Sequence, residues 1–161
     1  MNSSKLLYLL SLITILGLAS CGDDDEEDGF SLVGTNFSIS DITGTWNATQ
    51  AIFGTTSGAA ISVDVVAQGG TVVLQISSNG NFQVTVTENG AAPETSSGRM
   101  GFDEDLLVIS FDDSPDDYEF FGSTFNDPIL TISGGNGLVE FDFDNDGSDE
   151  PADIDFILER Q

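Results

Sequence analysis

Apolar and polar residues alternate along much of the chain, in the pattern of strands that bury one face. In 82–86, Phe and Val alternate with Gln and Thr, and the apolar positions of 72–76 recur with the same spacing. Asn79-Gly80 lies between these runs, and Asn-Gly is a strong signal for a tight hairpin turn. The pattern therefore predicts two antiparallel strands joined by a short turn.

Short apolar runs of the same kind continue on both sides of this hairpin. They predict strands at 45–53, 61–67, 106–111, 118–125, 129–132, 138–143 and 154–158. Turn residues separate many of them, including Asn89-Gly90, Ser114-Pro115, Asp127-Pro128 and Gly134-Gly135-Asn136-Gly137. Outside the first twenty residues no stretch has a helical apolar period. We expect an all-β antiparallel barrel of about 8 to 10 strands, since closure removes exposed edges, with a β-sandwich as the alternative.

The start of the chain has the layout of a secretory signal. Lys5 precedes an apolar run over 6–17, which is too short for a bilayer span of about 20 residues. Leu18-Ala19-Ser20-Cys21 follows and resembles the lipobox of bacterial lipoproteins. The resemblance implies that 1–20 is a signal peptide and that Cys21 carries a lipid anchor to the membrane. An ordinary signal peptide followed by a chance cysteine is the alternative.

Six consecutive carboxylates at 23–28 follow the cysteine without a counter-charge, so this tract should stay extended and solvated. It resembles the acidic tag that directs lipoproteins of some Gram-negative bacteria to the outer face of the outer membrane. The resemblance implies a lipid-anchored protein at the cell surface, whereas a plain solvated spacer is the alternative. We expect a lipidated linker over 21–37 and a folded domain over 38–161.

Composition excludes several kinds of site. The 161 residues include 28 Asp and Glu, 3 Lys and Arg, one Cys and no His, for a formal charge of −25. Ser-His-Asp and Cys-His sites, Cys/His zinc cages and an intramolecular disulfide are therefore ruled out. With so few cations the chain should bind no nucleic acid. We expect a protein that is not an enzyme, the alternative being a hydrolase that uses carboxylates alone.

Motifs at the two ends of the domain carry a family resemblance. Gly44-Thr45-Trp46 opens the first predicted strand, and Arg160 ends the last one. This pairing resembles the lipocalin-like, or calycin, domains of bacterial envelope lipoproteins, which implies that Arg160 covers Trp46 at a closed barrel end. Such a cation-π contact is worth about 0.5 to 2 kcal/mol. An unrelated β-sandwich with one core Trp is the alternative.

The resemblance leaves two functions open. A hollow barrel would bind a small apolar ligand or a partner at the cell surface. A filled barrel would serve as a structural or interaction module of a surface assembly. Many bulky rings are available to fill the interior: Phe53, Phe82, Phe102, Phe111, Phe120, Phe121, Phe125, Phe141, Phe143 and Phe156.

An acidic segment near the end of the chain resembles the loops of EF-hands and other DxDxDG calcium motifs. Carboxylates that alternate around Gly147 can bring several oxygens to one point, as Ca²⁺ requires. Asp153 stands where the motif has Glu, and strands flank the segment. A bare turn at Asn145-Asp146-Gly147 is the alternative. The candidate calcium ligands are Asp142, Asp144, Asp146, Ser148, Glu150 and Asp153.

Overall fold

The computed structural model describes residues 30–135, 139–144 and 146–161, which form one short helix and ten strands. All strand pairs are antiparallel, in the order β2-β1-β3-β4-β5-β6-β7-β8-β10-β9. The elements are α1 (Ile39–Ile42), β1 (Gly44–Thr55), β2 (Ser62–Asp64), β3 (Thr71–Ile76), β4 (Asn81–Thr87), β5 (Glu94–Asp103), β6 (Leu106–Phe111), β7 (Ser114–Asn126), β8 (Ile129–Gly134), β9 (Glu140–Phe141) and β10 (Glu150–Arg160).

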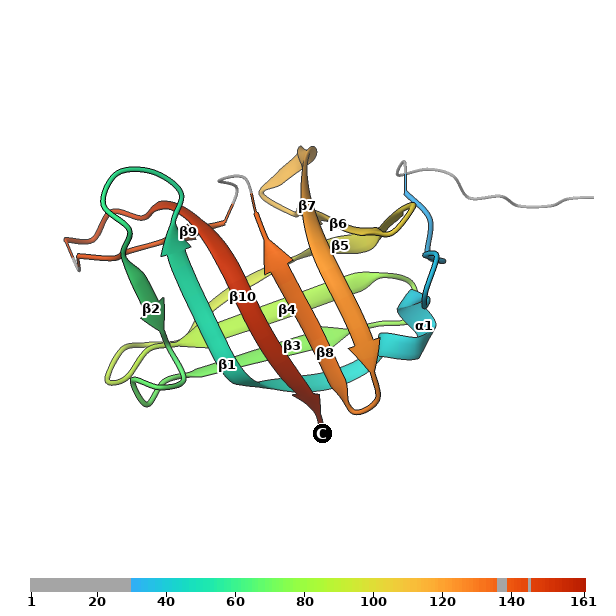
Figure 1. Cartoon of the computed structure of the whole chain (residues 1–161), viewed down its shortest axis with the longest axis horizontal. Helices are drawn as coiled ribbons and strands as arrows, with labels where there is room; N and C mark the ends of the chain where they lie inside the picture. The colour runs from blue at the N-terminus through green and yellow to red at the C-terminus, as the bar shows by residue number, and fades with distance from the viewer. Residues whose placement is uncertain (1–29, 136–138, 145) are drawn as a thin grey trace, which may run out of the picture.

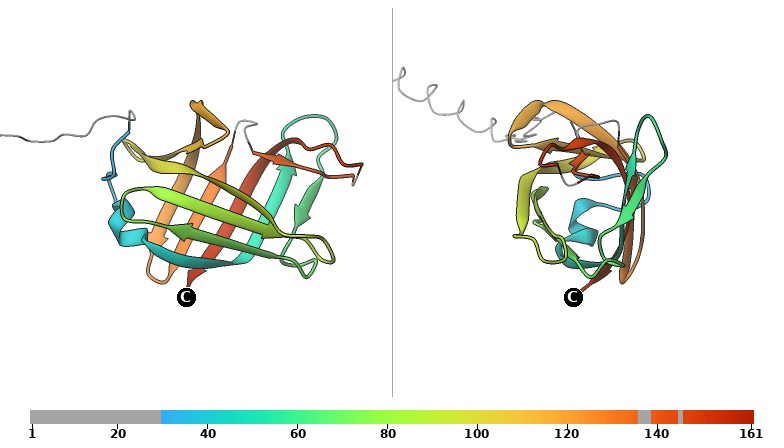
Figure 2. Two further views of the ribbon diagram at one scale, coloured as in Figure 1. Left: turned by 180° about the vertical axis from the view of Figure 1, so that it is seen from behind. Right: turned by 90° about the vertical axis from the view of Figure 1, so that its left-hand side faces the viewer.

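The sheet closes on itself. β1 pairs with β3 on one side and with β10 on the other, from Trp46 opposite Arg160 to Thr55 opposite Ala152. Eight strands form the closed ring; among the described elements, β2 and β9 pair with strands of this ring without being part of it. Figure 1 and Figure 2 show the strands wrapped around a common interior. The predicted all-β antiparallel barrel is confirmed, and the sandwich alternative is wrong.

A short helix plugs one end of the barrel. The Asp41 carboxylate accepts hydrogen bonds from the Ser38 N–H (2.8 Å) and hydroxyl (2.7 Å), which fixes the first turn of α1. Ile39 and Ile42 turn inward and are fully buried. At this end, to the right in Figure 1, the chain enters β1. Hydrophobic burial by two isoleucines thus holds a helix too short to be stable alone.

Most of the predicted strands are present, with differences in their bounds. The segment at 61–67 forms only the three-residue β2, and 138–143 contributes only β9 within the described residues. Asn79-Gly80, Asn89-Gly90 and Asp127-Pro128 lie between strands as predicted. Ser114-Pro115 begins β7 instead of forming a turn, because Asp112 and Asp113 make the reversal.

The sequence did not predict β5. Its ten residues, ETSSGRMGFD, show no apolar alternation over their first half. The strand nevertheless pairs along its length with β4 and β6. Gly98 lies where an added Cβ would collide with the Ser110 carbonyl oxygen, so this close approach requires glycine.

Residues before the helix also contact the barrel. Ser31 forms an antiparallel bridge with Phe102, and the Phe37 ring packs edge-on against Phe102 at 5.1 Å between centroids. No helix within the described ranges has the length and apolar character needed to cross a membrane.

Candidate ligand-binding site

A cavity of about 410 Å³ occupies the barrel interior. Strand alternation turns one apolar face of each wall strand inward. None of the α1 residues contributes to the lining, so the cavity belongs to the end away from the helix. Thirteen of its described lining residues are apolar: Phe53, Leu74, Phe82, Val84, Val86, Met100, Ile109, Phe111, Phe121, Ile132, Val139, Ile154 and Phe156.

The phenylalanines line this interior without filling it. Five phenylalanine rings form part of the cavity wall. Phe125 packs against Phe37 instead, at 5.8 Å between centroids, and Phe120 is 39% exposed on the outer face. Phe141 stacks on Phe53 at 4.5 Å and brings β9 against the inner wall. The space that remains falls in the range of small-molecule sites, about 300 to 1,000 Å³.

The mouth of the cavity is acidic. Glu94, Asp113, Glu140 and Asp149 belong to the lining, and all four are exposed. Partial burial raises the pKa of neighbouring Glu88 above its ordinary value, and the charges of Glu94, Asp142 and Asp149 raise that pKa further. A concentrated negative charge therefore surrounds the opening.

One carboxylate lies inside the protein near this opening. Glu119 is 1% exposed and accepts a hydrogen bond from the Val139 N–H at 3.1 Å. It faces inward because the β6–β7 register pairs it with Ile109. The apolar pattern of the sequence did not single out Glu119, although its position two residues before the inward Phe121 was the available signal. Its contact with Val139 connects β7 to the cavity wall.

At the opposite end, Trp46 forms the base of the barrel. Its side chain is fully buried, and its Nε1–H donates to the Ile42 carbonyl at 2.8 Å. Gly44 has φ +136°, and a Cβ there would lie 3.3 Å from Nη1 of Arg160. Backbone conformation and available space both favour glycine at this position. The structure thus brings the three motif residues Gly44, Trp46 and Arg160 together.

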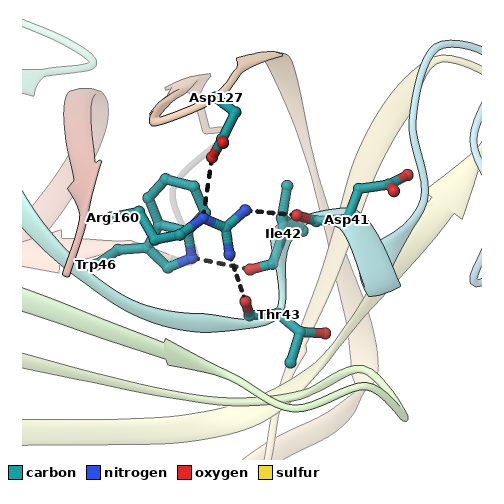
Figure 3. Close-up of polar contacts among 6 residues, drawn as sticks. All are labelled: Asp41, Ile42, Thr43, Trp46, Asp127 and Arg160. Atoms are coloured by element: carbon teal, nitrogen blue, oxygen red, sulfur yellow. Dashed lines mark hydrogen bonds and ion pairs between the residues drawn. The ribbon is translucent and has the colours of Figure 1, made fainter.

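Arg160 closes this end from outside (Figure 3). Its guanidinium carbon lies 4.3 Å from the centre of the Trp46 ring. Its two terminal nitrogens donate to the carbonyls of Thr43 and Asp41, both at 2.5 Å. Nε donates to the Asp127 carboxylate at 3.1 Å. One side chain therefore joins the last strand to α1, β1 and the β7–β8 turn.

The acidic segment before β10 brings together three of the six candidate calcium ligands. Carboxylate oxygens of Asp142, Asp144 and Asp146 lie within 4.8 Å of one another. The Ser148 N–H donates to Asp146. The remaining two candidates are not members of this cluster: Glu150 accepts a hydrogen bond from the Phe143 N–H, and Asp153 lies within β10 opposite Gly54. Calcium binding stays a prediction.

The candidate lipidation site, Cys21, and the acidic tract at 23–28 lie outside the described residues.

Comparison with known proteins yields one structural similarity. The sequence matches no protein-family model and no curated protein. The fold is similar to the crystal structure of an uncharacterized protein from Bacteroides eggerthii, with a TM-score of 0.42 and 10% identity. The similarity covers 74% of this chain and 98% of that one.

Proposed function

We propose that this chain is a non-enzymatic, lipid-anchored protein of the bacterial envelope whose lipocalin-like barrel binds a small apolar molecule in its interior. The observation that carries the proposal is the cavity of about 410 Å³, walled by thirteen apolar side chains. Such a concave, mostly apolar space with a few polar groups at its edge is typical of small-molecule sites. Binding would be driven by removal of apolar ligand surface from water.

Binding of a small molecule in the interior requires a rigid barrel, and the contacts at the closed end make it rigid. The strands are continuous around the ring, and the Arg160 contacts join the last strand to the first. Trp46 and the isoleucines of α1 seal this end with buried apolar side chains. A preformed cavity lowers the entropy cost of binding, because few groups must be ordered when the ligand enters.

The test is binding of a neutral apolar dye, N-phenyl-1-naphthylamine, whose fluorescence rises in apolar surroundings. We expect saturable binding to the domain and competition by other small apolar molecules. Val84→Trp places a larger side chain in the cavity wall and should weaken dye binding at least about tenfold, since it occupies ligand space. Equal dye binding by this variant, with the fold retained by circular dichroism, would contradict the proposal.

A matched control is available one residue along the same strand. Thr85 contacts Thr95 on the outer face, with 3.1 Å between their hydroxyl oxygens. Thr85→Trp adds the same ring outside the barrel and should leave dye binding unchanged. Comparison of the two variants separates occupation of the cavity from the general effect of an added indole.

An interaction module is the second candidate. Leu106, Tyr118 and Phe120 are 41%, 46% and 39% exposed. Tyr118 and Phe120 are two residues apart and lie on the same face of β7. Phe120 pairs with Val108 of β6. This candidate predicts that Tyr118→Ser with Phe120→Ser disrupts a surface assembly while dye binding persists. If the assembly is lost in Val84→Trp but not in the double serine variant, the cavity and not the exposed face is required, which favours the ligand-binding function.

A further inference from the structure

The polar groups of the cavity carry charge of only one sign. Four exposed carboxylates lie in the lining, those of Glu94, Asp113, Glu140 and Asp149. The other polar lining residues are Ser96 and Ser114, and no described lining residue is Lys or Arg. A ligand that enters the cavity must therefore pass these four carboxylates. If its polar group stays at the mouth, that group lies beside them.

The carboxylates come from separate elements that meet at the opening. Glu94 begins β5 and pairs with Val86, a cavity-lining residue, so its side chain lies on the interior side of the sheet. Asp113 is in the β6–β7 turn, Glu140 is in β9, and Asp149 directly precedes β10. Their convergence comes from the barrel topology, because strand ends and turns far apart in sequence meet at one rim.

Aromatic rings lie just inside this rim. Phe111 ends β6, two residues before Asp113, and packs edge-on against Phe82 at 5.7 Å between centroids. Both rings line the cavity. Ring faces attract cations, most strongly where water is partly excluded. Carboxylates outside and aromatic rings inside form the combination that favours an organic cation over a strongly hydrated inorganic ion.

The chain offers no cation to an acidic ligand at this site within the described residues. Arg160 lies at the other end of the barrel, over Trp46, and neither residue is in the lining. Arg99 lies in a separate polar depression with Gln83 and Ser97. A fatty acid whose tail entered the cavity would thus leave its carboxylate among like charges, which costs free energy.

We propose that the cavity selects cationic amphiphiles, with the apolar chain inside the barrel and an ammonium-type group among the four carboxylates at its mouth. This inference rests on the proposed function, because it names the ligand class of the same cavity. The expected order of affinity is cationic, then neutral, then anionic, for ligands that share one apolar chain. The order separates this barrel from a fatty-acid carrier.

The test uses three decyl compounds below their micelle concentrations: decyltrimethylammonium, decanol and decanoate. Each displaces N-phenyl-1-naphthylamine from the domain at low and at high NaCl. The cation should bind at least about tenfold more tightly than the anion at low salt, and the difference should shrink as salt screens the rim. Decanol affinity should change little with salt.

A neutral-rim variant assigns the selectivity to the four carboxylates. Glu94→Gln, Asp113→Asn, Glu140→Gln and Asp149→Asn together should reduce the advantage of the cation over the anion to about twofold or less while decanol binding persists. The control removes the same number of carboxylates from the closed end, with Asp103→Asn, Glu104→Gln, Asp105→Asn and Glu159→Gln. It should keep the preference, because these residues are not in the lining.

The outcomes separate the two proposals. If the dye and all three decyl compounds fail to bind, the proposed function itself fails. If they bind with equal affinity, or decanoate binds best, the cavity carries apolar ligands but the inference of cation selectivity is overturned. Cation selectivity at the rim is also overturned if the closed-end control loses the preference as completely as the neutral-rim variant, since overall charge would then explain it.

Discussion

Arg160 combines several interactions that the strands alone do not supply. Its charge faces the Trp46 ring, and its planar fork reaches two backbone carbonyls and the Asp127 carboxylate. A lysine has one ammonium group and cannot present this geometry. The carbonyls of Asp41 and Thr43 would otherwise need water at the edge of a packed barrel end.

Arg160→Ala should destabilise the fold by about 2 to 4 kcal/mol, because charged hydrogen bonds and the cation-π contact are lost together. Arg160→Lys should fall between the parent and the alanine variant. Since Trp46 is the only tryptophan, its fluorescence reports directly on this end during urea unfolding.

Arg99→Ala serves as the control for the loss of one positive charge, because Arg99 lies in β5 away from Trp46. This substitution should leave the native Trp46 spectrum unchanged. A free energy of unfolding for Arg160→Ala equal to that of the parent would show that these contacts contribute nothing to stability.

Glu88 provides a prediction of pH dependence. Its raised pKa means that the folded state disfavours the ionised carboxyl more than the unfolded chain does. As pH falls through the folded pKa, the folded state takes up the proton first and gains stability. Glu88→Gln should therefore raise the melting temperature slightly at pH 7, and the gain should vanish below about pH 4, where the carboxyl is neutral in both states.

Thermal unfolding across this pH range provides the measurement. Glu159→Gln is the control, because Glu159 lies at the end of β10, beside Arg160. A melting temperature for Glu88→Gln that stays below that of the parent at pH 7 would show that the ionised Glu88 carboxyl does not destabilise the fold.

A contact between two residues can be predicted from sequence where the chain has few residues of each type. With a single Trp and few cations in the chain, the family resemblance could pair Trp46 with Arg160 before any geometry was known. Sequence could not reveal how many phenylalanines point inward, since register decides that. Phe120 and Phe121 are adjacent, yet one is exposed and the other lines the cavity. The buried position of Glu119 likewise follows from the β6–β7 register, which places it opposite Ile109.

At the scale of elements, the strands with strict alternation were predictable and β5 was not. A strand flanked by two partners gains its stability from pairing, so polar and glycine residues are tolerated there. β3 and β4 follow the apolar pattern closely, with Leu74 opposite Val84. The acidic loop was recognisable from its spacing, but the sequence could not show that Asp153 would be drawn into β10.

The acidic loop carries the prediction of calcium binding. Three carboxylates within 4.8 Å repel one another, and a divalent cation would relieve that repulsion. Calcium at about 1 mM, a concentration suited to extracellular modules, should raise the melting temperature of the parent. Asp144→Ala with Asp146→Ala should abolish the rise.

Asp103→Ala with Asp105→Ala removes two carboxylates, one from the end of β5 and one from the turn that follows it, and should retain the full response. Magnesium at the same concentration distinguishes specific coordination from general charge screening, because its smaller shell fits such a loop poorly. A parent protein that does not respond to calcium would refute the metal site.

At the scale of the molecule, the two barrel ends differ in chemistry. Buried apolar residues and Arg160 close one end, and four carboxylates surround the opening at the other. A lipid anchor on Cys21 would hold such a container at a membrane without requiring the acidic surface to contact lipid headgroups.

Cys21→Ala should abolish incorporation of labelled palmitate and shift the protein from the membrane fraction to the soluble fraction. Ser20→Ala keeps a small residue beside the cysteine and should leave both properties intact. Membrane association of the Cys21→Ala protein equal to that of the parent would refute the anchor.

The seam between β1 and β10 also governs how the chain can fold. The Arg160 contacts join positions 117 and 119 residues apart in sequence, so the ring cannot close until the last strand has emerged. Contacts of such long range make folding slow, on the order of milliseconds to seconds for all-β domains. During that interval the free edge of β1 is open to pairing with other chains. Pairing of β10 along β1 therefore removes an edge that would otherwise be open to aggregation.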